Sequence, residues 1–396
     1  MKKKDSIVIV SGARTAVGKF GGSLKEYEAS DLGGFAIKAA YERAGIQAED
    51  IDEVVMGCVA SAAENAFMAR LSSVKAGIPY EASAITVNRL CSSGLQAIVT
   101  GAMEIQLGFA NIVAAGGGES MNNIPFYLRK ARFGYRMGNG NFEDGLITAL
   151  SDPFTGCHMG ITAENIAEKY AISREDQDAW AALSQNRAAT ARDTGKFKEE
   201  IVPVEYHVSR KETAVFDTDE FIRDNVTAES LAKLKPAFKK DGTVTAGNAS
   251  GINDAGAAVM LMKEEEAKKR GIKPIVRVVD AAAAGVDPAL MGTGPIPSTR
   301  KLFEKTGLTK DDIGLFELNE AFASQTLACV RELGLDPEKV NVNGSGISMG
   351  HPIGATGAVI AIKLMNEMKR RNVRYGISTL CIGGGQGLSV LFELCE

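Results

Sequence analysis

The sequence lacks a hydrophobic run long enough to cross a membrane. A spanning helix needs about 18 or more consecutive apolar residues, and no uncharged stretch of that kind occurs. The basic start is followed by only the short run SIVIV (6–10), whereas a secretory signal needs an apolar region of about 7–15 residues. We therefore expect a cytoplasmic protein that does not associate with membranes.

Cysteine and histidine are both scarce. Six cysteines, none in a CxxC spacing, and three histidines occur among 396 residues. This scarcity excludes a disulfide framework and the usual ligand spacing of a zinc site, so we expect a reduced compartment and no bound metal. Neither sign of charge dominates, since 45 Lys and Arg face 49 Asp and Glu. Without a basic patch, a nucleic-acid partner is not expected.

Glycine, by contrast, is abundant, and it accompanies a regular alternation of strand and helix patterns. The 43 glycines cluster in short runs, which indicates close approaches of the backbone to a ligand or to another helix. Runs typical of strands at 7–13, 51–57 and 111–120 alternate with amphipathic helical patterns such as 31–45. This alternation predicts a layered α/β fold.

The same order of elements recurs near the C-terminus and predicts an internal duplication. The two copies align, with small shifts, at several points: Gly45 on Gly307, Asp50-Ile51 on Asp312-Ile313, Ser93-Gly94 on Thr356-Gly357, and Gly116 on Gly383. We interpret the chain as two similar α/β halves. The first half is residues 1–120 plus 251–273, the second is 274–396, and a loop-rich inserted domain at 121–250 serves ligand binding and oligomer contacts.

Cys91 lies in a short turn between a predicted strand at 83–88 and a predicted helix at 95–108. Unpaired N–H groups and the positive end of the helix dipole point at the first turn of a helix, and both favour a thiolate over a thiol. The position therefore predicts a lowered pKa and a nucleophilic role for Cys91. A buried structural cysteine on a tight turn is the alternative interpretation.

The duplication places a second loop, which carries His351, at the same level as Cys91. Neighbouring strand ends of the second half carry Asn319 and Cys381, so these four side chains converge on one cleft. A cysteine, a histidine that activates it and an orienting amide form a nucleophile set, and nearby glycine N–H groups could hold an oxyanion. Taken singly, each residue also fits a structural role: His351 as a satisfied polar residue, Cys381 as a core cysteine and Asn319 as a helix cap.

Five motifs connect these residues with a known family. They are ARTAVGKFGG (13–22), NRLCSSG (88–94), NEAFA (319–323), GHPIGATGA (350–358) and CIGGGQG (381–387). In this order and spacing they closely resemble the thiolase family, in particular the short-chain acetyl-CoA acetyltransferases. The resemblance implies a duplicated five-layered αβαβα fold, a homotetramer, and the reversible Claisen condensation of two acetyl-CoA to acetoacetyl-CoA and CoA. It implies no cofactor, because the CoA esters are themselves the substrates.

The resemblance also implies a role for each matching residue. Cys91 would take the acetyl group as a thioester in a ping-pong scheme, and His351 would be the base that activates it. His351 and a water held by Asn319 would form one oxyanion hole, and the backbone N–H groups of Cys91 and Gly383 would form the other. Cys381 would remove the α-proton from the second acetyl-CoA.

Binding residues are implied in the same way. The loop GCHMGITAEN (156–165) resembles that of short-chain biosynthetic thiolases, in which bulky side chains exclude long acyl tails. The positions that match pocket-wall or CoA-contacting residues are Leu150, His158, Met159, Arg223, Phe238, Ala246, Ser250, Met291 and Phe322. The sequence departs from the common family pattern at Ala16, at Gly118 and in NGSGISMG (343–350), and no departure removes a catalytic group.

Three alternatives share part of this pattern. A degradative 3-ketoacyl-CoA thiolase of broader chain length has the same catalytic set. Ketoacyl-carrier-protein synthases have the duplicated fold without an equivalent of Cys381, and a non-catalytic CoA- or lipid-binding relative would lack a catalytic residue, whereas all are present here. If Cys91 and Cys381 face one cleft, a reversible disulfide between them is a further hypothesis.

Overall fold

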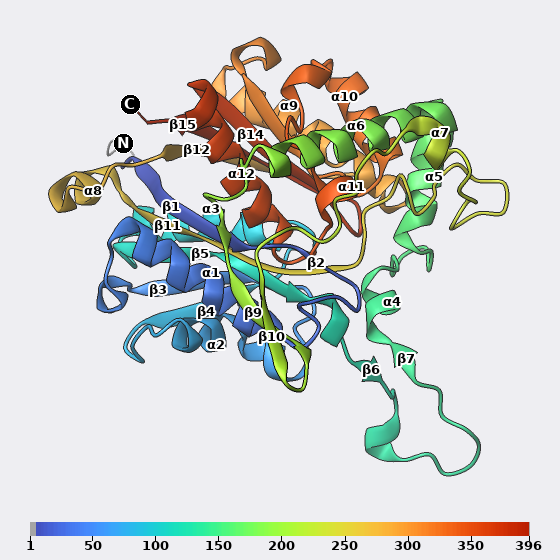
Figure 1. Cartoon of the computed structure of the whole chain (residues 1–396), viewed down its shortest axis with the longest axis horizontal. Coiled ribbons are helices and arrows are strands. Elements are labelled where there is room, and N and C mark those ends of the chain that lie inside the picture. The colour runs from blue at the N-terminus through green and yellow to red at the C-terminus, as the bar shows by residue number, and fades with distance from the viewer. Residues whose placement is uncertain (1–4, 396) are drawn as a thin grey trace.

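The computed structural model describes residues 5–395, and most of its strands form one continuous sheet built from two halves (Figure 1). From the middle of the sheet to one edge, the first half supplies β1 (Ile7–Thr15), β11 (Asn253–Lys263), β5 (Ile112–Ser120), β3 (Glu53–Gly57) and β4 (Ser83–Val87). In the same order the second half supplies β12 (Val276–Gly285), β15 (Gln386–Leu394), β14 (Tyr375–Ile382) and β13 (Leu315–Leu318). β1 and β12 pair antiparallel and join the halves.

The repeated strand order is the internal duplication that the sequence predicts. Equivalent helices also end alike, because Gly45 and Gly307 each follow a helix in the left-handed conformation, with φ of 68° and 72°. The counterpart of β4 in the second half is reduced to a single bridge between Phe316 and Val340. Thus β4 forms a ladder at one edge of the sheet, and the opposite edge is formed by β13.

The predicted alignment of Gly116 with Gly383 is wrong. Gly116 lies within β5, whereas Gly383 lies in the turn between β14 and β15. The registers of the two ladders instead align Val113 with Gly376. The two glycine runs serve different purposes. The glycines of β5 allow the backbone of neighbouring segments to pack closely against the strand. The run at 383–385 forms a turn, in which Gly384 has a φ of 76°.

Helices on both sides of each half give five layers. α3 (Ser93–Leu107) and α12 (Thr356–Arg371) form the middle layer and pack against strands of both halves in one buried cluster. The outer layers are formed by α1 (Ala29–Ala44) and α2 (Met68–Lys75) on the first half, and by α9 (Pro295–Thr306) and α10 (Ala323–Leu333) on the second. The αβαβα fold implied by the resemblance is therefore confirmed (Figure 1). Two shorter helices are α8 (Glu264–Arg270) and α11 (Gly346–Met349).

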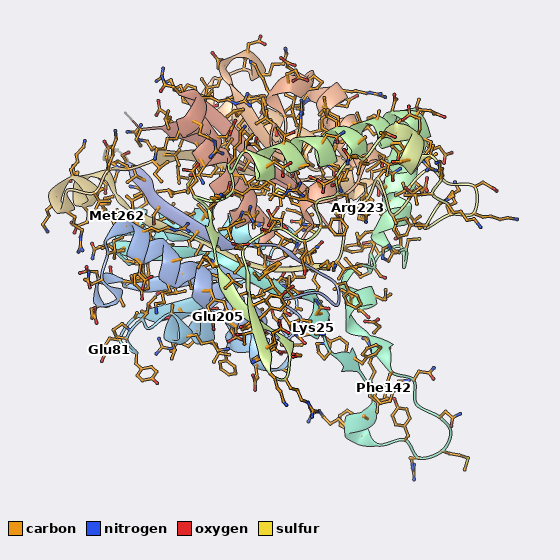
Figure 2. All side chains as sticks on the ribbon, viewed as in Figure 1. Lys25, Glu81, Phe142, Glu205, Arg223 and Met262 are labelled. Carbon is orange, nitrogen blue, oxygen red and sulfur yellow. The ribbon has the colours of Figure 1, made fainter. Side chains whose placement is uncertain are left out.

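Residues 121–250 leave the first half between β5 and β11. Their helices are α4 (Gly145–Ala149), α5 (Met159–Lys169), α6 (Arg174–Asp193) and α7 (Ala228–Leu231). Two pairs of strands lie within this region: β6 (Phe126–Tyr127) with β7 (Glu143–Asp144), and β9 (Val204–Ser209) with β10 (Glu212–Phe216). A fifth strand of the region, β8 (Ile201–Val202), pairs with β1 of the large sheet. Before the insertion, the short strand β2 (Gly18–Lys19) pairs with β11. An arm beyond β6 and β7 projects from the body, and Figure 2 shows Phe142 on it. Within residues 5–395, no helix is long and apolar enough to span a membrane.

A buried ion-pair cluster fastens the inserted region to the first half. The fully buried Arg14 of β1 has its Nε 2.9 Å from Glu200 Oε2 and its Nη1 2.7 Å from Asp219 Oδ1. Asp219 also accepts the backbone N–H of Val17 at 2.8 Å. Because an unpaired buried charge is costly, these contacts hold the segments around Glu200 and Asp219 beside β1.

Candidate active site

Cys91 lies on a tight turn between β4 and α3, as the sequence predicts. Asn88 Oδ1 accepts the Leu90 N–H at 2.9 Å. Ser93 Oγ accepts the Arg89 N–H at 2.9 Å and donates to the Leu90 carbonyl oxygen at 2.6 Å. Leu90 itself has a φ of 48°, a conformation that costs a non-glycine residue roughly 1–3 kcal/mol. These hydrogen bonds hold a strained turn that presents the sulfur of Cys91 just ahead of the helix.

The pKa of Cys91 is raised, so the predicted lowering is wrong. Burial raises this pKa most, and the negative charge of Glu119 raises it further. The backbone N–H groups of Gly383 and of Cys91 itself lower it. The helix start does supply N–H groups, but their effect is smaller than the loss of solvation of the thiolate. Cys91 therefore rests as a thiol and needs a base.

His351 has the protonation state and the tautomer that such a base requires. Burial lowers the pKa of His351 to about 4, so the imidazole is neutral at pH 7. Nδ1 lies 2.7 Å from Thr356 Oγ1, and this hydroxyl donates its proton to the Pro352 carbonyl oxygen at 2.9 Å. The hydroxyl must then accept from Nδ1–H, which leaves Nε2 unprotonated and able to take a proton. The His351 N–H donates to Asn253 Oδ1 at 3.0 Å and fixes the loop.

Asn319 lies behind His351 and not on the cavity wall. Its Nδ2 is 3.4 Å from both ring nitrogens of His351, and its N–H donates to the Thr379 carbonyl oxygen at 3.0 Å. Asn319 Oδ1 is buried and accepts no hydrogen bond from the described residues. A buried polar atom of this kind ordinarily has a partner. The amide oxygen is thus available to hold a small polar group beside the imidazole.

Cys381 lies at the end of β14, on the half of the protein opposite Cys91. Burial raises the pKa of Cys381 well above its ordinary value, and a negative charge on Cys91, when it forms, acts in the same direction. It packs in an apolar cluster with Met159, Met291 and Phe322. The surroundings of Cys381 therefore make its thiolate costly to form and strongly basic once formed.

One cavity of about 430 Å³ brings these groups together. Cys91, His351, Cys381 and Gly383 all line it. So do all nine residues predicted to bind substrate, namely Leu150, His158, Met159, Arg223, Phe238, Ala246, Ser250, Met291 and Phe322. The side chains come from both halves and from the inserted region, so the cavity exists only in the complete fold.

Aromatic rings form part of the cavity wall. The rings of His158 and Phe238 stack with centroids 4.9 Å apart and an interplanar angle of 17°. Burial lowers the pKa of His158, and its Nδ1 accepts the Gly160 N–H at 3.1 Å. Arg223, labelled in Figure 2, has its guanidinium 5.3 Å from the centre of the Phe221 ring. This wall combines flat apolar faces with one cation, which suits a ligand that has a ring and phosphates.

Sequence reasoning missed several residues of the site. The sequence did contain a signal for Thr356, because this hydroxyl residue follows His351 within the GHPIGATGA motif. Val59 and Phe221 line the cavity without any motif that marks them, and Ile353 lines it from within the GHPIGATGA motif. Among residues 5–395, no group of three or more His, Cys, Asp or Glu side chains is arranged to hold a metal ion.

The fold and the two-cysteine site define a thiolase, and family models agree. Residues 7–265 match the N-terminal thiolase domain, and residues 272–394 match the C-terminal thiolase domain. The chain belongs to the thiolase family.

Individual relatives match over nearly the whole length. The chain is 52% identical to an acetyl-CoA acetyltransferase of Syntrophomonas wolfei and 49% identical to the beta-ketothiolase BktB of Cupriavidus necator, with 98% of each chain covered in both cases. It is similar to the crystal structure of the Bacillus anthracis acetyl-CoA acetyltransferase, with a TM-score of 0.97, 45% identity and 100% of each chain covered. Human mitochondrial 3-ketoacyl-CoA thiolase in complex with CoA matches with a TM-score of 0.95 and 43% identity, covering 99% of this chain and 98% of that one.

Proposed function

We propose that the protein is an acetyl-CoA C-acetyltransferase that condenses two acetyl-CoA to acetoacetyl-CoA and CoA, and that also runs the reverse thiolysis. The observation that carries the proposal is the meeting of two cysteines from opposite halves with a neutral histidine on one cavity. One cysteine can then carry an acyl group while the other acts as a base, which a single thiol cannot do. The relatives named acetyl-CoA acetyltransferase support the same activity.

The first half-reaction transfers an acetyl group to Cys91. His351 Nε2 takes the thiol proton, and the sulfur attacks the carbonyl carbon of acetyl-CoA while the bond from that carbon to the CoA sulfur breaks. Backbone N–H groups of Cys91 and Gly383 are directed at the reacting sulfur, and they suit the oxyanion of the acyl group carried there. The departing CoA thiolate takes the proton of Cys381 and leaves as the thiol, so Cys381 becomes a thiolate.

The second half-reaction forms the carbon–carbon bond. The Cys381 thiolate removes the α-proton of a second acetyl-CoA, and the enolate attacks the acetyl carbonyl on Cys91. The C–S bond of the thioester breaks, and the released Cys91 sulfur regains its proton from the His351 imidazolium. The enolate oxygen faces His351 and a water held by the unpartnered Asn319 Oδ1. One well-aimed donor of this kind is worth about 2.7–4 kcal/mol.

CoA esters fit the cavity without any cofactor. The stacked His158 and Phe238 rings and Arg223 form a wall for a base and phosphates, and Ser250 and Ala246 line the same cavity as the two sulfurs. The CoA complex of the human relative supports this class of ligand. We expect saturation of both half-reactions by CoA esters in buffer that contains a metal chelator, measured by steady-state kinetics.

The acyl group that the site accepts is short. Met159, Met291 and Phe322 close the cavity around Cys381, which supports acetyl over longer tails. The 3-ketoacyl-CoA thiolase and beta-ketothiolase relatives support a broader range as the second candidate. Thiolysis of 3-ketoacyl-CoA esters of increasing length decides between them. Efficient cleavage of medium or long chains would overturn the short-chain proposal.

Copies of the chain assemble as a homotetramer in the cytoplasm. The edge strand β4 exposes Ile85, and β6 together with the arm beyond it exposes large apolar side chains: Phe126, Leu128, Phe133, Tyr135, Met137 and Phe142. Exposed apolar patches of this kind are typical of subunit interfaces. Light scattering of the purified protein tests the assembly, and a monomer would contradict it.

A further inference from the structure

Glu119 is a completely buried carboxylate beside the cavity wall, and the reaction steps above give it no role. It lies near the end of β5, and its side chain is 0% exposed. None of the lysine, arginine or histidine side chains within residues 5–395 forms a salt bridge with it. A buried carboxylate without a cation is costly, so its stability depends on the hydrogen bonds that it accepts.

The carboxylate holds a loop of the first half. Glu119 Oε2 accepts the Val59 N–H at 2.9 Å, and Oε1 accepts the Ala60 N–H at 3.2 Å. The Cys58 thiol lies 3.6 Å from Oε1 as a weaker donor. Val59 lines the cavity and packs in the same apolar cluster as Cys91. Glu119 therefore fixes the wall on the Cys91 side.

The loop that carries His351 crosses the same carboxylate from the second half. A Cβ placed on Gly354 would lie 2.5 Å from Glu119 Oε2 and 3.1 Å from Cys58 Cα, so glycine is required at the crossing. The Gly354 backbone N–H also stabilises the ionised carboxylate and thereby lowers the pKa of Glu119. One side chain thus contacts two loops, of which one packs beside Cys91 and the other holds His351.

Charge connects Glu119 with the nucleophile as well. The negative carboxylate raises the pKa of Cys91, and burial raises the pKa of Glu119 itself to about 7. The titratable groups that face the carboxylate are Cys58, from the end of β3, and Cys91, from the start of α3. The adjoining strand β11 places Ala255 opposite Glu119, and the second half approaches through the backbone of Gly354.

We propose that Glu119 is a positioning residue of the acyl-transfer site. Its carboxylate holds the 58–60 loop and the Gly354 loop in register, and its charge adds to the larger effect of burial in keeping Cys91 a thiol until His351 takes the proton. The turnover measurement rests on the proposed function, because it needs a CoA ester as substrate. The measurement of Cys91 reactivity is independent of that function, because alkylation needs no CoA ester.

The test compares the full-length parent with Glu119→Gln. Glutamine keeps the size of the side chain, removes the charge and turns one acceptor into a donor that opposes a loop N–H. We expect kcat for acetoacetyl-CoA thiolysis to fall about 10- to 100-fold, as misplacement of reacting groups does. The pH midpoint of Cys91 alkylation by iodoacetamide, followed by peptide mass spectrometry, should drop by about half a unit or more. A kcat within about twofold of the parent, or an unshifted midpoint, would overturn the proposal.

Two further variants separate position from charge. Glu164→Gln removes another buried carboxylate that accepts loop N–H groups, those of Thr243 and Val244, so the Cys91 midpoint should stay at the parent value. Glu119→Asp keeps the charge on a shorter side chain and should lower kcat without lowering the midpoint. It also replaces Glu119→Gln if that variant does not fold, and a lowered midpoint in Glu119→Asp would overturn the proposal. If the parent turns over no CoA ester, the proposed function fails while the alkylation comparison still stands.

Discussion

His351 Nδ1 lies 2.7 Å from Thr356 Oγ1, and the hydroxyl proton of Thr356 is directed to the Pro352 carbonyl oxygen. This arrangement selects the tautomer in which Nε2 is the base. Thr356→Val keeps the shape of the side chain and removes the acceptor for Nδ1–H. We expect acylation of Cys91 by acetyl-CoA to slow about 10²- to 10⁴-fold, the usual contribution of a positioned base. Rapid quench with mass spectrometry measures this rate.

Thr356→Ser is the matched control for that measurement. Serine retains the hydroxyl and loses only a methyl group, so His351 keeps its acceptor and acylation should stay within about threefold of the parent. If Thr356→Val acylates Cys91 as fast as Thr356→Ser does, the hydroxyl does not select the tautomer.

The two cysteines should separate the half-reactions. Cys91→Ala removes the acyl carrier, so neither acetyl transfer nor condensation is expected. Cys381→Ala leaves the carrier intact, and the departing CoA thiolate can take the proton of the His351 imidazolium or of water instead. A stable acetyl adduct should therefore accumulate on Cys91 after incubation with acetyl-CoA, without carbon–carbon bond formation. Intact-mass and peptide mass spectrometry detect the adduct. An adduct in Cys91→Ala that is absent from the parent would refute the assignment.

The pH at which the acylation rate of Cys91 falls on acidification should match the lowered pKa of His351. Because His351 acts as a base, it must be neutral, and with a pKa of about 4 it stays neutral as pH falls from 7 to about 5. Activity is then lost as pH falls through about 4, when the imidazolium forms. Single-turnover acylation after a brief pH jump measures this pH. A fall centred near the ordinary histidine value of about 6.5 would contradict the burial effect.

The convergence of the catalytic groups could be predicted because a duplication imposes it. Equivalent strand ends of two similar halves lie at one level, so Cys91 and His351 must approach each other once the repeat is found. The same logic failed for Gly116 and Gly383, since a glycine run can serve either a turn or close strand packing. Sequence similarity within the repeat does not distinguish these two uses.

The electrostatics of the site could not be predicted from the sequence. The helix start suggested a lowered pKa for Cys91, but desolvation and the charge of Glu119 outweigh the N–H groups. Glu119 comes from a strand and Thr356 from a helix start far from Cys91 in the chain, and neither distance nor burial is visible in a motif. Motifs therefore identify the reacting residues, but not the residues that set the pKa values and orientations of those reacting groups.

The buried Arg14 should be a sensitive point for stability. Arg14→Met removes the cation between Glu200 and Asp219 and leaves two buried carboxylates without compensation, a loss of about 3–5 kcal/mol for a broken buried pair. The apparent melting temperature should fall by several degrees at a fixed scan rate. Arg300→Met is the control, because Arg300 and its partner Glu332 are both exposed, with 53% and 42% of their side chains accessible, and such pairs contribute about 0–1 kcal/mol. Equal melting temperatures for the two variants would mean that the Arg14 cluster does not hold the inserted region in place.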